Sequence, residues 1–205
     1  MTQALALIEF DSIAAGVLAV DRMLKQAPIA LLKCGSVHPG RYLALVGGSV
    51  ATTEEAHGMG VAVAREKDAL CDEIFLPDPH PLLIAAVGGI RTAPQGESVG
   101  VVEVSGSPGL LRGVDAALKA LPVDLVEIRL ADDLGGRALA VFDGQLPDVQ
   151  EALAVTADRL GGRAALCGSS LLPRLDDTLR EVLAAGTTFA ACATLTPEGA
   201  ETVEG

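Results

Sequence analysis

The first hundred residues alternate between short apolar runs and segments whose apolar residues recur at helical spacing. Short apolar runs predict strands, and a recurrence every three or four residues predicts a helix with one apolar face. Residues 13–27 show the helical pattern, with a stripe made of Ile13, Val17, Val20, Leu24 and Ala27. This half is predicted to form a strand, a helix, two strands, a helix, a strand and a short helix, over residues 5–10, 13–27, 29–32, 41–46, 52–67, 71–76 and 79–87.

The same order of elements returns in the second half. Its first helix carries Leu111, Val114, Leu118 and Leu121 on one face. Glycine and proline in residues 88–97 mark a linker between the halves, and glycine and proline also mark residues 34–40 as a loop between two strands. The predicted strands cover residues 98–104, 125–130, 137–142 and 164–172, and the predicted helices cover residues 110–121, 147–160 and 176–183.

The two halves are copies of one unit of about 90 residues. Matching residues lie 94 apart at first and 96 apart after two inserted residues, as in Glu9 and Glu103, Asp21 and Asp115, Lys25 and Lys119, Arg41 and Arg137, and Cys71 and Cys167. Each unit has the order β-α-β-β-α-β plus a terminal helix, which packs helices against one mainly antiparallel sheet. We therefore predict an α+β fold of two tandem ferredoxin-like domains, over residues 1–92 and 97–186, followed by a C-terminal extension over residues 187–205.

Composition and charge narrow the class of partner. The chain has 205 residues, half of them apolar, and a formal net charge of −12. Nucleic acid binding needs a basic face, so this charge argues against such a partner. The first residues lack the basic start and apolar run of a signal peptide, and the uncharged run of residues 182–197 is too short for a membrane span. We expect a cytoplasmic protein that binds neither nucleic acid nor a membrane.

Residues that could carry catalysis are sparse. The four cysteines form no C-x-x-C pair, and the equivalent positions of Cys71 and Cys167 beside predicted strands favour buried structural thiols. The spacing of His38, His57 and His80 suggests no Ser-His-Asp or Cys-His arrangement. The Gly-Gly pairs lack the lysine and spacing of a phosphate loop. We do not expect an enzyme.

Three motifs together resemble the shell proteins of bacterial microcompartments. They are the helix end and strand from Asp21 to Leu32, the loop that ends in proline, glycine and Arg41, and the Leu-Pro pair before Arg174. Two unpermuted copies in one chain are similar to the tandem-domain class of that family. The resemblance covers residues 4–186, and within the family the chain is similar to the propanediol-utilisation branch that holds an iron–sulfur cluster.

The resemblance implies a homotrimer whose six domains form a flat, pseudohexameric tile. Such tiles pack with other shell proteins, both hexamers and pentamers, into a shell around metabolic enzymes. It also implies that the loops between the second and third strands meet at the tile centre and line a pore, which we expect to pass small polar metabolites. The implied pore-lining residues are Gly35, Ser36, Val37, His38, Pro39 and Gly40 in the first loop and Ala131, Asp132, Asp133, Leu134 and Gly135 in the second.

The resemblance places further residues at the tile edge. The lysine of the first helix in each unit meets its counterpart in the neighbouring tile, and these residues are Lys25 and Lys119. An arginine after the Leu-Pro pair makes another edge contact, which Arg174 matches. The first unit has Asp78 at that place, followed by a proline and His80, so we expect two kinds of edge, with His80 at one of them.

The first loop differs from the related branch at the cluster ligand. That branch has a cysteine before the Pro-Gly pair, where this chain has His38. Thiolate is the usual ligand of an iron–sulfur cluster, so we expect no cofactor. Three copies of His38 around one axis leave three interpretations: a metal site, a gate that protonation controls, or a solvated loop histidine.

Two other functions fit the same elements. Tandem ferredoxin-like units also occur in amino-acid sensing domains, which would form a dimer with a ligand between the units and no dependence on Lys25 or Lys119. The second is an electron-transfer shell protein with a metal centre. The hypothesis that we carry forward is a structural protein of the microcompartment shell.

Overall fold

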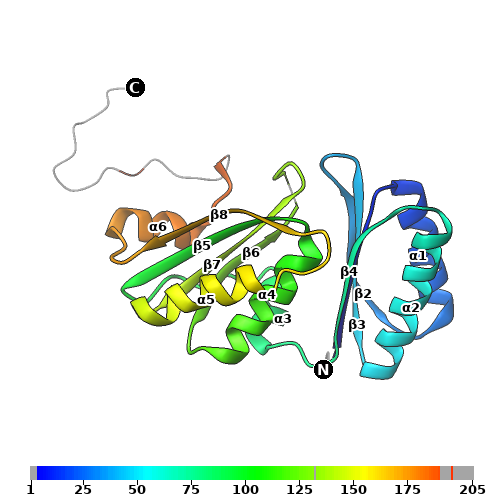
Figure 1. The fold of residues 1–205 in the computed structure, drawn as a ribbon, viewed down its shortest axis with the longest axis horizontal. Helices are drawn as coiled ribbons and strands as arrows, with labels where there is room; N and C mark the ends of the chain where they lie inside the picture. Colours follow the sequence, from blue (N-terminus) through cyan, green and yellow to red (C-terminus); the bar gives the residue numbers. More distant parts are fainter. Residues whose placement is uncertain (1–3, 132, 190–194, 196–205) are drawn as a thin grey trace.

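The computed structural model describes residues 4–131, 133–189 and 195. It contains two four-stranded sheets, each with two long helices on one face (Figure 1). The first unit consists of β1 Ala4–Phe10, α1 Ile13–Gln26, β2 Ala30–Val37, β3 Arg41–Gly48, α2 Val50–Glu66, β4 Leu70–Leu76 and α3 Pro81–Val87. The second consists of β5 Ser98–Ser105, α4 Ser107–Ala120, β6 Asp124–Leu130, β7 Arg137–Gly144, α5 Leu146–Asp158, β8 Ala165–Leu172 and α6 Asp177–Ala185.

The strand order is the same in both sheets, β2-β3-β1-β4 and β6-β7-β5-β8, and every pairing is antiparallel. The predicted α+β fold of two repeated units is therefore confirmed. The exact domain boundaries stay a prediction. Within the described part of the chain, no helix has both the length and the apolar character that crossing a membrane requires.

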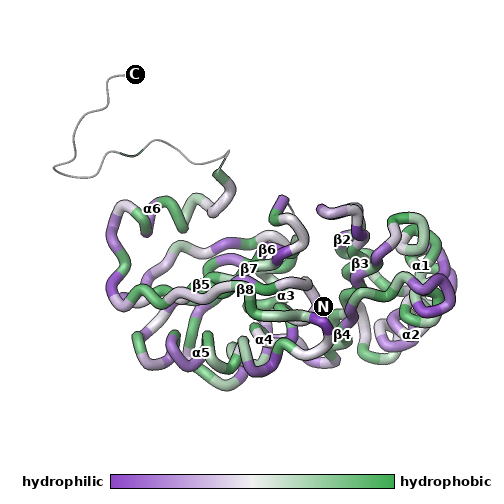
Figure 2. The backbone as a smooth tube through the Cα atoms, turned by 45° about the horizontal axis from the view of Figure 1, so that its top comes forward, coloured by the Kyte–Doolittle hydropathy of each residue, from purple (hydrophilic) through white to green (hydrophobic). Residues whose placement is uncertain are grey.

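The two central strands of the first sheet, β1 and β3, are buried on both faces. All of β1 is buried, because alternate side chains of a strand point to opposite faces and both faces are covered here. Ile8 and Phe10 pack with α1 and α2, whereas Leu5 and Leu7 join a core shared with the second unit. Figure 2 shows the first sheet lying between α1 and α2 on one side and the second unit on the other.

The apolar stripes of the two matching helices have different environments. An apolar stripe normally faces the core, and in α4 Leu111 and Leu118 are buried, with exposed fractions of 0% and 5%. Their counterparts in α1, Val17 and Leu24, are 53% and 45% exposed. The buried face of α1 consists instead of Ala15, Gly16, Ala19, Val20 and Met23. The difference arises because α4 packs on α5 and also on β1 and β4 of the first unit, whereas α1 has no second unit beside it.

Two further expectations are wrong. Residues 34–37 were expected in a loop, but β2 continues to Val37 because Ser36 and Val37 pair with Tyr42 and Arg41 of β3. Cys71 and Cys167 were expected to be buried thiols. Cys71 is half-buried, but Cys167 is exposed, because it lies in the edge strand β8, most of which is exposed.

We expect Gly113→Ala to lower the free energy of unfolding by about 2 kcal/mol, the usual scale of overpacking. A Cβ at Gly113 would lie 2.5 Å from the carbonyl oxygen of Thr156, so α4 and α5 would have to separate. The matched control is Gly58→Ala in α2, where a Cβ meets nothing within 4 Å. In the control, the higher helix propensity of alanine should raise the free energy of unfolding by about 0.5–1 kcal/mol. Denaturant unfolding at equal protein concentration measures the free energy of unfolding of both variants. Equal changes in the two variants would contradict the packing argument.

Candidate pore and edge residues

The first candidate pore loop is the tip of the β2–β3 hairpin. Ser36, His38, Pro39 and Gly40 are exposed, whereas Val37 is half-buried. Gly40 has a φ of +86°, a conformation that favours glycine, and this lets the chain reverse into β3. His38 thus lies at an exposed hairpin tip, accessible to another molecule.

The second candidate loop connects β6 to β7. Ala131 and Asp133 have left-handed backbone, with φ of +61° and +57°, and Gly135 follows at +61°. Ala131 is buried, whereas Asp133 and Gly135 are exposed and Leu134 is half-buried. Asp132 lies outside the described residues.

The structure brings the two candidate loops together. A Cβ built on Gly136, at the end of the second loop, would lie 3.0 Å from Cδ of Pro39 and 3.5 Å from the carbonyl oxygen of His38. The hairpin tips of both units therefore touch within one chain. This contact is what a continuous ring of loops around one axis requires of neighbouring domains.

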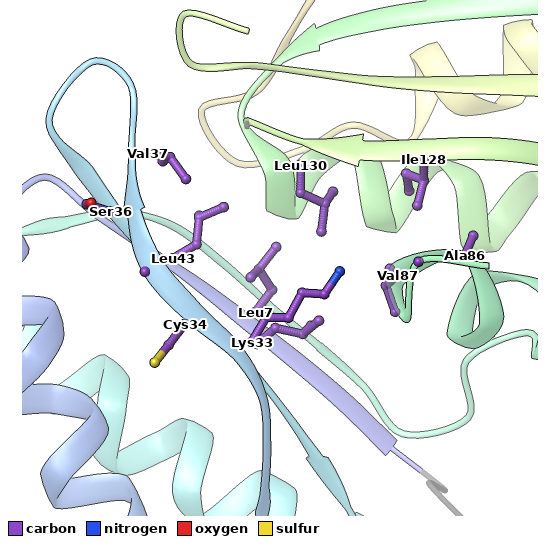
Figure 3. Close-up of a pocket in the computed structure, with 13 residues that line it drawn as sticks. Leu7, Lys33, Cys34, Ser36, Val37, Leu43, Ala86, Val87, Ile128 and Leu130 are labelled. Atoms are coloured by element: carbon purple, nitrogen blue, oxygen red, sulfur yellow. The ribbon is translucent and has the colours of Figure 1, made fainter. Parts of the chain in front are cut away.

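A cavity of about 330 Å³ lies between the two units, beside the first loop. Val37 and Lys33 of β2 point into it, and Ile128 and Leu130 of β6 face them across it (Figure 3). The walls are mostly apolar, and the described residues provide the Lys33 ammonium with no hydrogen-bond or ion-pair partner. The complete lining is Leu7, Lys33, Cys34, Gly35, Ser36, Val37, Leu43, Leu45, Ala86, Val87, Gly89, Ile128 and Leu130. Three of the predicted pore residues thus border an internal space as well as the hairpin tip.

A buried carboxylate joins the two units. Glu9 is 1% exposed, and its Oε1 accepts a hydrogen bond of 2.6 Å from Nη1 of Arg41. Its Oε2 accepts a bond of 3.2 Å from the backbone N–H of Ser107, at the start of α4. The Glu9 carboxylate raises the pKa of Arg41, so the guanidinium stays charged at physiological pH.

The matching pair in the second unit is open to solvent. Nη1 of Arg137 lies 3.1 Å from Oε2 of Glu103, and the two side chains are 59% and 43% exposed. Sequence reasoning assigned these four residues no role. The recurrence of glutamate and arginine in both copies was the available signal, but it does not reveal which pair is buried.

The candidate edge lysines have the same local geometry. Nζ of Lys25 lies 2.7 Å from Asp21, and Nζ of Lys119 lies 2.7 Å from Asp115, each one helical turn away. The Lys25 side chain is 71% exposed and that of Lys119 is 43% exposed. Both ammonium groups are therefore held near a helix end and remain accessible to another molecule.

The other two candidate edge residues have different surroundings. Arg174 is exposed in the connection from β8 to α6. His80 is half-buried at the junction of the units, where its Nδ1 accepts a hydrogen bond of 3.3 Å from the N–H of Leu82 and caps α3. Its own backbone N–H donates to Asp115 at 2.8 Å. Among the residues described, no group of three or more His, Cys, Asp or Glu side chains is arranged to hold a metal ion.

Comparison with known proteins identifies the family. The BMC domain family model matches residues 4–79 and 98–175, which is one match per unit. The chain therefore belongs to the BMC domain family and carries two such domains in tandem.

Individual relatives agree with this assignment. The chain is 32% identical to the bacterial microcompartment shell protein PduT of Citrobacter freundii, over 87% of this chain and 96% of that protein. It is 29% identical to the carboxysome assembly protein CcmO of Synechocystis sp., over 90% of this chain and 65% of that one. The crystal structure of a microcompartments protein from Desulfitobacterium hafniense DCB has 29% identity and a TM-score of 0.76, over 88% of this chain and 99% of that one. The chain is thus a structural shell protein of the microcompartment type.

Proposed function

We propose that three copies of this chain form a closed, pseudohexameric tile of a microcompartment shell, with a central pore. The observation that carries this proposal is the unequal burial of matching residues in the two units. Leu111 and Leu118 of α4 are buried against the first unit, while Val17 and Leu24 of α1 are exposed. The apolar stripe of α4 is therefore used in a contact within the chain, whereas the matching stripe of α1 is left open.

The open surface on the second unit complements α1. Within the chain, α4 packs on the face of the first sheet that lies opposite α1 and α2. It lies next to α3, in which Leu83 is completely buried. The matching helix of the second unit is α6, in which Leu179, the counterpart of Leu83, is 38% exposed, and Leu166 of β8 is 47% exposed. Docking this face on α1 of a second copy would repeat the contact made within the chain.

A head-to-tail contact of this kind forms a ring if its rotation closes. The family resemblance implies closure at three chains, which is six domains. The same docking would enclose the exposed Glu103–Arg137 pair, as Glu9 and Arg41 are enclosed within the chain.

The tile edge and the pore follow from the same arrangement. We place Lys25, Lys119 and Arg174 at the edge together with His80, whose capping contact uses Nδ1 and leaves Nε2 for a neighbour. The loops of residues 35–40 and 131–135 would meet around the axis, where Ser36, His38 and the aspartates favour small polar metabolites over apolar ones. In this proposal the tile packs with other shell proteins around enzymes in the cytoplasm and has no catalytic role of its own.

We expect the wild-type protein to have a mass of about 63 kDa by light scattering, three times the chain mass of 20.9 kDa. The double variant Val17→Asp/Leu24→Asp should remain folded but run as a monomer. Both side chains are exposed in the single chain, but two unpaired carboxylates in an apolar contact cost several kcal/mol. Val50→Asp, an exposed apolar position at the start of α2, is the control and should keep the trimer mass. A wild-type dimer would favour the sensor-module alternative.

Replacing both edge lysines, in Lys25→Ala/Lys119→Ala, should abolish flat sheets in electron microscopy while the trimer mass is unchanged. Each contact is weak, but many are repeated across a sheet, so their loss is multiplied. Lys67→Ala is the matched control, because Lys67 is also a surface lysine paired to a neighbouring acid, Glu66, at 3.0 Å. Sheets that persist in the double variant would exclude the lysines as edge contacts.

Shells built with Ser36→Trp should admit a small polar substrate several-fold more slowly than wild-type shells. The indole would narrow the opening and remove a hydroxyl donor from its wall. The rate of an encapsulated enzyme at low external substrate concentration measures this flux. Ala154→Trp, on the exposed side of α5, provides the control. Equal flux through both variants would show that the metabolite does not pass between these loops.

A further inference from the structure

The two matching edge strands differ in what covers them. β2 and β6 occupy the same place in their sheets, and Leu31 and Leu125 pair with matching residues of β3 and β7. Leu31 and Leu32 of β2 are 38% and 39% exposed, whereas Leu125 and Val126 of β6 are 3% and 1% exposed. An uncovered apolar edge strand is a liability, and proteins normally pair or cover it.

The segment that follows α3 covers β6. The backbone N–H of Thr92 donates to the carbonyl of Val126 at 3.2 Å, and its hydroxyl donates to the carbonyl of Leu125 at 3.1 Å. The neighbouring Arg91 forms an ion pair with Glu127 of the same strand. The linker between the domains thus acts as an added edge segment on the second sheet.

The repeat supplies the matching segment for β2. Residues 187–189 follow α6 as residues 91–93 follow α3, and Thr188 lies 96 residues after Thr92. α6 packs on the second sheet through Leu183, just as α3 packs on the first. The next residue, Phe189, is 94% exposed, which is unusual for a large aromatic side chain.

The single chain does not bring this segment to β2. Within the chain the segment begins against β6, where Nη1 of Arg129 donates to the Thr187 hydroxyl at 3.3 Å, and the edge of that strand is already occupied by the linker. Figure 1 shows α6 at the far side of the second unit, away from β2 in the first. Among the described residues, the open edge that matches the one the linker covers is β2, and the segment after α6 would meet it in a second copy.

We propose that residues 187–189 of one copy lie along β2 of the next copy, as residues 91–93 lie along β6 within the chain. This inference rests on the proposed trimer and specifies the contact that closes it. Thr188 takes the place beside Leu31 and Leu32 that Thr92 has beside their counterparts, Leu125 and Val126. The Phe189 ring packs on the apolar surface that this strand edge leaves exposed. The segment after α6 is thereby part of the ring contact and not a free tail.

Cysteine cross-linking tests the contact in the full-length protein. Thr188→Cys and Leu32→Cys are combined in a background where the native cysteines are replaced by serine, and the protein is mildly oxidised. Residues adjacent across a strand pair lie within the range that a disulfide spans. Since every copy carries both cysteines, we expect a covalent trimer of about 63 kDa, three chains of 20.9 kDa, on non-reducing denaturing gels.

The matched control is Thr92→Cys with Val126→Cys, which has the same geometry inside one chain. It should form its disulfide without changing the mass seen on the gel. If the control closes and the particle in solution is a trimer, but residues 188 and 32 do not cross-link, this inference is wrong and the proposed function stands. If light scattering shows a monomer, the proposed trimer itself fails.

A second variant does not depend on the cysteine background. Phe189→Ser should raise the dissociation constant of the trimer about tenfold or more, the scale expected when an aromatic anchor is lost from an interface. Phe189 is exposed in the single chain, so its replacement should leave the fold unchanged. Val50→Ser is the control at another exposed apolar position and should have no effect. An unchanged dissociation constant for Phe189→Ser would overturn the contact.

Discussion

Burial of the central strands of the first sheet on both faces is the constraint on which the other features depend. β1 directs Ile8 and Phe10 toward its own helices and Leu5 and Leu7 toward the second unit, so apolar side chains on both sides need cover. The two units consequently share one core instead of forming two separate globules. Glu9 fixes their relative position, because a nearly inaccessible carboxylate must keep its hydrogen-bond donors on both units.

The same constraint explains how one repeated unit acquires two environments. A chain with two copies contains only one junction between them, so α4 is covered while α1 is open, and β6 is covered while β2 is open. Repeated units that cannot bury their surfaces alone commonly do so against neighbours. In the proposed trimer, the exposed apolar positions of this chain form one half of a contact that the two units already make within the chain.

Much of the fold could be predicted because its signals are local. Periodicity located the helices and most strands, and the repeat showed that both units share one topology. Residues 34–37 were misassigned because glycine and serine favour loops, whereas the hydrogen bonds of Ser36 and Val37 come from a partner strand. The exposure of Cys167 was missed for a similar reason. Matching positions indicate matching local structure, but burial depends on what packs against them.

The sequence by itself determined the family motifs, the two copies and the pairing of each candidate edge lysine with an acid one turn before it. Only the tertiary structure decided which apolar stripe is buried, which Glu–Arg pair lies at a junction, and that the tips at Pro39 and Gly136 touch. The physical reason is the distance along the chain over which each kind of interaction acts. Propensity and periodicity act over a few residues, whereas burial and the contact of loops almost a hundred residues apart depend on how whole domains pack.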